Sequence, residues 1–405
     1  MKNDLLGSET NVMMYDFDRV IDRRGTNCSK WDNVGGRIGN PDALPMWVAD
    51  MDFPAPKPVM DAVCKLANSG IYGYSYLPPA FKEATVRWMK VRHDWDISDA
   101  GVDYVCSILP VLFTAVQVFS EPGDSIILQQ PVYYPFMQAV ENQGRVVSNN
   151  ELKLVDGHYE IDFEDLEKRA ADPKAKIMFL CSPHNPVGRV YTREELEKIG
   201  EICCRNHVLI ISDEVHSDFV YPGHKHTPMA SISEEIAANT ITAIAPSKTF
   251  NTAGLRAAAM ITFNKELRDR MNPVLQNNRC VSISSFGLEA YIAAYSEGEE
   301  YVEQLLTYLQ GNIRYLDETL KASMPKIKLI QPEGTYLMWL DCRELGLDDA
   351  ALDDFVTNKA AVGLDKGIWF GTHAGSGFMR MNVACPRATM EEAMKRLQQA
   401  YDALA

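Results

Sequence analysis

The chain has 405 residues, 46% of them hydrophobic and 23% charged, which is enough for one large domain with a smaller companion and is ordinary globular composition. Its formal net charge of −15 argues against a general affinity for nucleic acid or anionic lipid. Any anion must therefore be held by a local group of donors.

The N-terminal segment is polar. Residues 1–10 lack the apolar core of a secretory signal, and no apolar run approaches the roughly 20 residues needed to span a bilayer, so we expect a cytoplasmic protein with no membrane partner. The segment to about Met46 is irregular and polar, with Arg23, Arg24, Gly35 and Gly36, and cannot form a domain alone. We expect residues 1–48 to pack on the small domain or at a dimer interface.

The middle of the chain alternates short buried strands with helical patterns. Residues 192–204 open with Thr192 and Glu195, the two ends of a capping box, which indicates the start of a helix. Strand, helix, strand at this spacing predicts an α/β domain with a mainly parallel sheet sandwiched by helices, over residues 49–290. The four expected strands are Ser125–Leu128, Lys176–Cys181, Val208–Ser212 and Thr240–Ala245.

The pattern changes after about residue 290. Apolar residues recur at helical spacing from Val302 to Leu320, which predicts a long amphipathic helix. A strand is expected at Thr335–Leu340 and a terminal helix at Met390–Tyr401. Residues 291–405 are therefore predicted to form a smaller α+β domain.

The cysteines and histidines do not favour a metal site. The nine cysteines are an odd number without a C-x-x-C pair, so we expect reduced thiols. His224 and His226 share a loop with Pro222 and Gly223 but lack further ligands, so we expect them on a surface loop and expect no metal.

Candidate polar residues follow three of the expected strands. Lys248 lies just beyond the last of them, where open α/β sheets bind ligands; it is either a solvated side chain or a desolvated amine available for a Schiff base. Arg256, eight residues on, suits a phosphate. Asp213 follows the preceding strand and either caps a helix or pairs with a protonated pyridine nitrogen, with His216 three residues on. Asn185 is presented by a Pro- and Gly-containing turn.

Each of these motifs is weak alone, but their order is informative. They resemble the motifs of the fold-type-I pyridoxal 5′-phosphate (PLP) enzymes of the class I/II aminotransferase superfamily, from about Tyr15 to Arg387. The motifs that carry the resemblance are Asn185–Gly188, Asp213–His216, Ser247–Lys248 and Arg256. The resemblance implies an enzyme that binds PLP and forms a homodimer with shared active sites.

The resemblance also implies roles for single residues around the cofactor ring. Lys248 binds the cofactor covalently and later moves protons. Asp213 keeps the pyridine nitrogen protonated, so that the ring accepts electrons from the substrate. Asn185 and His216 bond the phenolic oxygen, where the family more often has tyrosine in place of His216. Tyr133 stacks on the ring face, while its neighbour at position 134 is expected on the pocket wall or the surface.

The phosphate is expected at a helix N-terminus beside a guanidinium. The implied residues are Ser107, Ile108, Leu109, Ser247, Arg256 and, from the neighbouring subunit, Tyr74. Two departures from the family stand here: many relatives have glycine near Ser107 and serine where this chain has Ala245.

The substrate carboxylate is expected at Arg380. This residue ends a segment with Gly371, Gly375 and Gly377, which resembles the one that delivers the carboxylate-binding arginine in the family, with Asn185 beside it. Such glycines also occur in dinucleotide loops, but no βαβ fingerprint follows.

Two further segments, Trp47–Phe53 and Gly73-Tyr74, resemble the bacterial cystathionine β-lyase branch, which includes a lyase that represses a maltose regulator. In that branch the first segment, with Ala49, borders the substrate carboxylate.

The function that we expect is a carbon–sulfur β-lyase, which takes cystathionine or cysteine conjugates to pyruvate, ammonia and a thiol, with a place in methionine biosynthesis. An aminotransferase with a 2-oxo acid acceptor uses the same residues and is the first alternative. The second alternative is a regulatory protein that retains PLP and binds a transcription factor, although no surface in the sequence indicates one.

Overall fold

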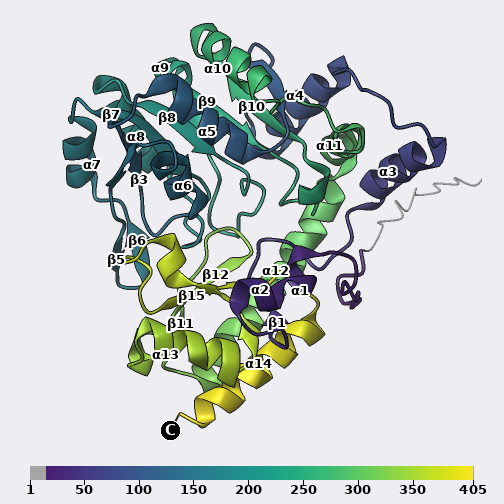
Figure 1. Cartoon of the computed structure of the whole chain (residues 1–405), viewed down its shortest axis with the longest axis vertical. Coiled ribbons are helices and arrows are strands. Elements are labelled where there is room, and N and C mark those ends of the chain that lie inside the picture. The colour runs from purple at the N-terminus through teal and green to yellow at the C-terminus, as the bar shows by residue number, and fades with distance from the viewer. Residues whose placement is uncertain (1–14, 405) are drawn as a thin grey trace, which may run out of the picture.

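A computed structural model describes residues 15–404, and a seven-stranded sheet forms its centre (Figure 1). The strands lie in the order β2-β10-β9-β8-β7-β3-β4. Their bounds are β2 Gly101–Val105, β3 Ser125–Leu128, β4 Val146–Asn149, β7 Ala175–Cys181, β8 Leu209–Asp213, β9 Thr240–Ile244 and β10 Ala258–Thr262.

Five of these strands, from β9 to β4, pair in parallel, while β10 pairs antiparallel with both of its neighbours, β9 and β2. The expected mainly parallel sheet is confirmed, and its four expected strands lie at β3, β7, β8 and β9. Every residue of β3 and β9 is buried, which is typical of parallel strands covered on both faces. The register pairs Cys181 with Asp213 and Asp213 with Ala243, so the carboxyl ends of three strands meet at one edge.

Helices cover both faces of the sheet. Because neighbouring strand residues point to opposite sides, each strand packs against both layers of helices. Ile126 and Leu128 pack with the residues of α5, α6 and α10, whereas Ile127 packs with those of α7, α8 and α9. The expected capping box of Thr192 and Glu195 opens α8. The bounds are α5 Ile108–Phe119, α6 Pro135–Glu141, α7 Phe163–Ala170, α8 Arg193–Arg205, α9 Glu234–Ala238 and α10 Lys265–Asn277.

A second, four-stranded antiparallel sheet lies below the first in Figure 1. The order is β11-β12-β15-β14, with α12 and α14 packed against each other nearby. The expected long helix, strand and terminal helix correspond to α12, β12 and α14. The bounds are β11 Lys328–Leu329, β12 Leu337–Asp341, β14 Asp365–Lys366, β15 Phe378–Asn382, α12 Glu299–Ser323, α13 Asp349–Asp354 and α14 Arg387–Asp402.

The N-terminal segment lies on the side of this second sheet. Its strand β1 pairs in parallel with β13, and α1 and α2 precede it. Helices α3 and α4 then lead to the large sheet and pack on α11. The remaining bounds are α1 Ser29–Asp32, α2 Val34–Ile38, β1 Leu44–Pro45, α3 Lys57–Ser69, α4 Pro79–His93, β5 Lys153–Val155, β6 His158–Glu160, α11 Ser285–Glu297 and β13 Val362–Gly363.

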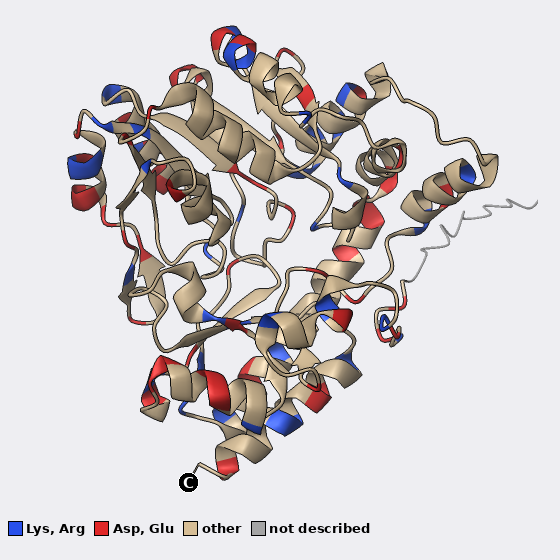
Figure 2. Cartoon of the chain, in the orientation of Figure 1, with Lys and Arg blue, Asp and Glu red and all other residues tan. Residues whose placement is uncertain are grey.

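Charged residues lie mainly on the outer helices and loops, with both signs interspersed, while most of the large sheet carries neither sign (Figure 2). Among the described helices, none combines the length and the apolar character needed to cross a membrane. All nine cysteines are free thiols, as expected. No cluster of potential metal ligands occurs within residues 15–404.

The loop with His224 and His226 differs from the expectation. His224 is partly exposed, but the His226 side chain is 2% exposed and its Nε2 lies 3.0 Å from a Glu214 carboxylate oxygen. The prediction of a surface position is therefore wrong for His226. The loop folds inward because the buried Glu214 carboxylate needs a polar partner.

Candidate active site

A cavity of about 160 Å³ lies at the carboxyl ends of the parallel strands. This is the edge where open α/β sheets bind ligands. It is lined by Ala49, Cys106, Ser107, Ile108, Leu109, Tyr133, Cys181, Asn185, Asp213, Val215, His216, Ala245, Ser247, Lys248, Ala253, Arg256 and Ala257. Segments from at least six parts of the chain, at 49, 106–109, 133, 181–185, 213–216 and 245–257, therefore meet around one space.

The Lys248 amine is the basic group at the centre of this site. It follows β9, and its Nζ donates a hydrogen bond of 2.8 Å to the backbone carbonyl of Ala49. Burial, and then the positive charge of Arg380, lower the pKa of Lys248 to about 8, against the opposing effects of Asp50 and Asp213. A sizeable neutral fraction near pH 7 to 8 makes this amine a nucleophile and a base.

Asp213 is an acid in a site that water hardly reaches. Burial raises the pKa of Asp213 to about 7, although a hydrogen bond from the Val215 amide and the charge of Lys248 both lower it. That amide donates to Oδ1 at 3.1 Å, and no hydrogen bond from the described residues reaches Oδ2. The carboxyl group can therefore share a proton with a basic ring nitrogen in the cavity.

His216 and Asn185 present further unfilled polar atoms. Burial, with the positive charges of Lys248 and Arg380, keeps the pKa of His216 well below its ordinary value, so the ring is neutral. Its Nδ1 is buried and makes no hydrogen bond within the described chain. The Asn185 side chain accepts from Arg380 through Oδ1, which leaves its amide nitrogen for a ligand. Both side chains suit an oxygen acceptor.

Arg380 lies on β15 and is 2% exposed. Its Nη1 donates to Asn185 Oδ1 at 2.8 Å, and its Nη2 donates to the Trp47 carbonyl at 3.1 Å. Nη2 also forms an ion pair with Asp365, which sits directly opposite in the β14–β15 register. The guanidinium, whose Nε has no hydrogen-bond partner among residues 15–404, is the candidate for a substrate carboxylate.

The opposite end of the cavity suits an anion. Helix α5 begins at Ile108, and Ser107 before it has an extended backbone and no side-chain capping bond, so the first amides of the helix are free for a ligand. Ser247 and Arg256 line the same cavity. Arg256 has φ of 58° and closes the turn before β10, which brings its guanidinium to the cavity.

Nearly all of the predicted site residues thus lie together, and Tyr133 is among them, with a pKa raised by burial. Arg380 is connected to these cavity residues by its hydrogen bond to the Asn185 side chain. Tyr74 does not join it, because its side chain is fully exposed.

Sequence reasoning missed several lining residues and one ion-pair partner. Cys106, Cys181 and Val215 line the cavity, and their places next to strand ends were a usable signal. Burial raises the pKa of the Cys181 thiol, and its sulfur accepts a weak hydrogen bond of 3.5 Å from the backbone N–H of Asn185. Asp365 gave no signal, because it meets Arg380 only through the pairing of two strands.

These residues fit the cofactor that the sequence resemblance implies. A lysine faces the cavity, a buried acid with an unfilled oxygen is available for a ring nitrogen, and the orphaned His216 Nδ1 awaits a polar partner. The uncapped start of α5 suits a phosphate. The donor set therefore matches PLP in its acid, its base and its anion site.

Comparison with known proteins agrees with this geometry. The family described as aminotransferase class I and II matches residues 46–397. The chain is 42% identical over 384 residues to cystathionine beta-lyase PatB of Bacillus subtilis strain 168, with 95% of this chain and 99% of that protein covered. It is 34% identical over 394 residues to protein MalY of Escherichia coli K12, with 96% and 100% covered. The crystal structure of cystalysin from Treponema denticola, which contains PLP, superposes with a TM-score of 0.93 at 36% identity, covering 97% of this chain and 100% of that one.

Proposed function

The chain belongs to the class I and II aminotransferase family, and from this premise we propose that it is a PLP-dependent carbon–sulfur β-lyase. It converts cystathionine or cysteine conjugates into pyruvate, ammonia and a thiol, and in the case of cystathionine the thiol serves methionine biosynthesis. The observation that carries the proposal is the cavity that joins Lys248 and Asp213, in a chain 42% identical to a cystathionine beta-lyase over nearly its whole length.

Arg380 anchors the substrate. Its guanidinium binds the α-carboxylate, and Asn185 and the Trp47–Phe53 segment at Ala49 flank it. Binding of the carboxylate at a fixed guanidinium would orient the substrate so that its Cα–H bond faces Lys248.

When bound, PLP supplies a conjugated ring that accepts the electron pair left on the substrate Cα. Lys248 holds the cofactor and, once freed, removes the Cα proton with its Nζ. The same nitrogen can then pass that proton to the sulfur that leaves from Cβ, because its lowered pKa lies close to neutral pH. One lysine thus serves as base and acid in succession.

Four side chains would contact the PLP ring. Asp213 would hold a proton at the ring nitrogen, and Asn185 and His216 would donate hydrogen bonds to the phenolic oxygen. Tyr133 would lie against one ring face. The neutral state of His216 supports this role, since a neutral imidazole can donate through one nitrogen without adding positive charge.

The phosphate would lie at the start of α5. The backbone amides of Ser107, Ile108 and Leu109 bind it together with Ser247 and Arg256. Serine at 107 in place of the glycine of many relatives still leaves the amides free, because the residue is extended and its side chain makes no capping bond.

An aminotransferase is the second candidate, since the family itself bears that name. The choice depends on the fate of the electrons on Cα: expulsion of a thiol from Cβ or protonation of the cofactor carbon. The likeness to PatB, which is named a cystathionine beta-lyase, supports elimination. The test is incubation of the pure protein with cystathionine, with and without a 2-oxo acid. Steady release of pyruvate and thiol without the acceptor is expected, whereas a single turnover that waits for the acceptor would overturn the proposal.

We also propose a homodimer with shared sites, in a chain divided at residues 48 and 290. The support for the dimer is a run of exposed apolar residues in Ile71–Leu77, in which Tyr74 has no contact with its own cavity. Tyr74 would reach the phosphate of the partner. Light scattering should give a dimer mass, and an active monomer would contradict the shared site.

The nine cysteines are free thiols, which supports a cytoplasmic location.

A further inference from the structure

The segment Trp47–Phe53, here called the strap, crosses the active site with nearly all of its backbone carbonyls bonded to side chains. Arg380 donates to Trp47, Lys248 to Ala49, Asn382 to Val48 and Asp50, Lys30 to Asp50, and Arg23 and Asn251 to Met51. Asn251 also donates to Phe53, and its Oδ1 accepts from the Met51 amide. The strap therefore contacts the candidate base and the candidate carboxylate anchor at once.

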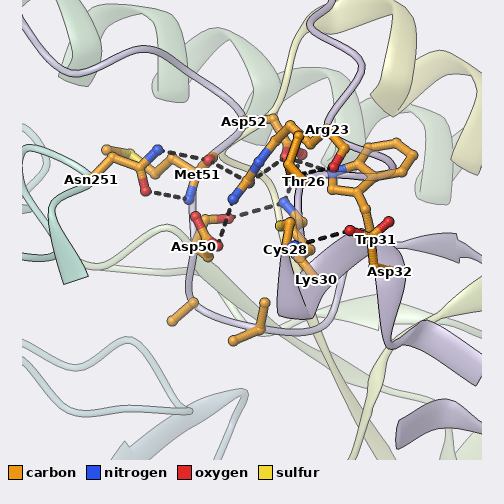
Figure 3. A network of polar contacts seen from close by, with 12 residues as sticks. Arg23, Thr26, Cys28, Lys30, Trp31, Asp32, Asp50, Met51, Asp52 and Asn251 are labelled. Atoms are coloured by element: carbon orange, nitrogen blue, oxygen red, sulfur yellow. Dashed lines mark hydrogen bonds and ion pairs between the residues drawn. The ribbon is translucent and has the colours of Figure 1, made fainter. Parts of the chain in front are cut away.

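The N-terminal segment fastens the outer side of the strap (Figure 3). Arg23 lies with its guanidinium between the two strap carboxylates, at 2.9 Å from Asp50 and at 2.9 Å from Asp52. The same guanidinium donates to the Met51 carbonyl at 3.0 Å. Lys30 pairs with Asp52 at 2.7 Å, and both of these side chains are buried.

The two carboxylates differ in how they are satisfied. Asp52 is 4% exposed and accepts from Arg23, Lys30 and Trp31. The Asp50 side chain is 27% exposed, and within the described chain its carboxylate has an ion pair with Arg23 alone. Asp50 directly follows Ala49, whose carbonyl accepts from the Lys248 amine at 2.8 Å. The charge of Asp50 favours the protonated Lys248 amine, and among residues 15–404 Arg23 is its one ionic partner.

The charged groups around Lys248 have opposing effects. Arg380 disfavours the protonated amine, Asp50 and Asp213 favour it, and His216 stays neutral. Arg23 affects the protonation of Lys248 from outside the cavity. It neutralises the Asp50 carboxylate and holds the Met51 carbonyl, which is next to Asp50 in the strap. Its side chain is 22% exposed, so the contact is open to substitution without a buried void.

We propose that Arg23 is a positioning residue for Lys248: it holds the strap, neutralises Asp50 and thereby sets the proton affinity of the Lys248 nitrogen. The inference rests on the proposed function, in which this nitrogen binds PLP and moves the proton. A residue of the N-terminal segment then governs the pH at which the site works, without touching the cavity.

The test uses the PLP-loaded protein and follows the absorbance of the bound cofactor against pH, which reports the protonation of the Lys248 nitrogen. Arg23→Met should raise the midpoint by about one pH unit, because Asp50 loses its counter-charge, and Asp50→Asn should lower it by a similar amount. Arg23→Lys should restore most of the native midpoint. Arg24→Met is the matched control: Arg24 is its neighbour, is exposed and pairs with Asp22, so the midpoint should stay unchanged.

Shifts of the same sign in Arg23→Met and Asp50→Asn, or no shift in either, would overturn the inference, because loosening of the strap alone has no reason to reverse sign. A second measurement separates this from failure of the proposed function. In the cofactor-free protein, the rate at which an amine-reactive reagent labels the Lys248 peptide should follow pH with the same two opposite shifts. If the native protein binds no PLP, the proposed function fails, while this labelling still decides the role of Arg23.

Discussion

The cavity and the strap network are both buried and polar, but they satisfy their polar atoms differently. In the cavity, Asp213 has an unfilled oxygen and His216 an unpartnered nitrogen. Behind the strap, Arg23 pairs with the carboxylates of Asp50 and Asp52, and Lys30 pairs with Asp52. Buried polar groups without partners are costly, so they persist where a ligand completes them. Within these two regions, the contrast separates polar residues that are free to meet a ligand from those that hold the backbone in place.

The largest effect is expected at the reactive amine. Lys248→Ala should lower the rate of pyruvate release by about 10³-fold or more, since it removes the base and the covalent anchor. Borohydride should fix the cofactor to a single peptide of the native protein, located by mass spectrometry, and to none in the variant. Labelling of any other lysine would contradict the assignment of Lys248 as the cofactor-binding residue and the assignment of the cavity as the active site.

The second effect is a loss of stability with rising pH, which the buried Asp213 carboxyl of the unpaired region should produce. The pKa of Asp213 in the folded protein is raised to about 7, above its ordinary value of 3.8, so the folded state binds the extra proton between these values. The cofactor-free protein should therefore lose up to about 4 kcal/mol of stability as pH rises through this window. Urea unfolding at several pH values should show a flatter profile for Asp213→Asn. Parallel profiles for the two proteins would contradict the raised pKa.

The third effect tests the strap network, in which the buried charges are paired. Lys30→Met leaves the buried Asp52 short of one partner and should cost about 3 kcal/mol of unfolding free energy. Lys265→Met is the control, because Lys265 pairs with Asp269 on the surface of α10, where such pairs contribute about 0 to 1 kcal/mol. Denaturant unfolding of both variants measures the difference. Equal losses would mean that the strap network is no more than a set of surface pairs.

The smallest of the four effects is a rate change without loss of binding. Asp213→Ala should still bind PLP but release pyruvate about 100-fold more slowly, because the ring nitrogen loses its proton partner and the ring accepts electrons poorly. Absorbance of the bound cofactor and the pyruvate assay give the two quantities separately. A near-native rate would exclude the role of Asp213.

The sequence predicts the residues that follow strands. Asn185, Asp213 and Lys248 lie at the ends of short buried strands or within four residues of them. Because the carboxyl ends of parallel strands share one edge, their meeting could be inferred from order alone. The long helix of the second domain is equally readable, since its apolar period extends over many turns.

Contacts between distant side chains could not be predicted in this way. The pairing of Asp365 with Arg380 depends on the register of two antiparallel strands, and that of Arg23 with Asp50 depends on how an irregular segment folds back. The burial of His226 depends on Glu214, which reads as an ordinary charged residue after a strand. Local patterns carry no information on which distant partner completes a buried charge.

The Cys181 thiol has a consequence for an enzyme that releases thiols. Thiol–disulfide exchange requires a thiolate, and burial raises the pKa of Cys181 and keeps its sulfur protonated. Disulfide forms of the product that enter the cavity would therefore find a poor attacking group, although the sulfur lines the wall. Burial thus makes the Cys181 sulfur a poor trap for the product as a mixed disulfide.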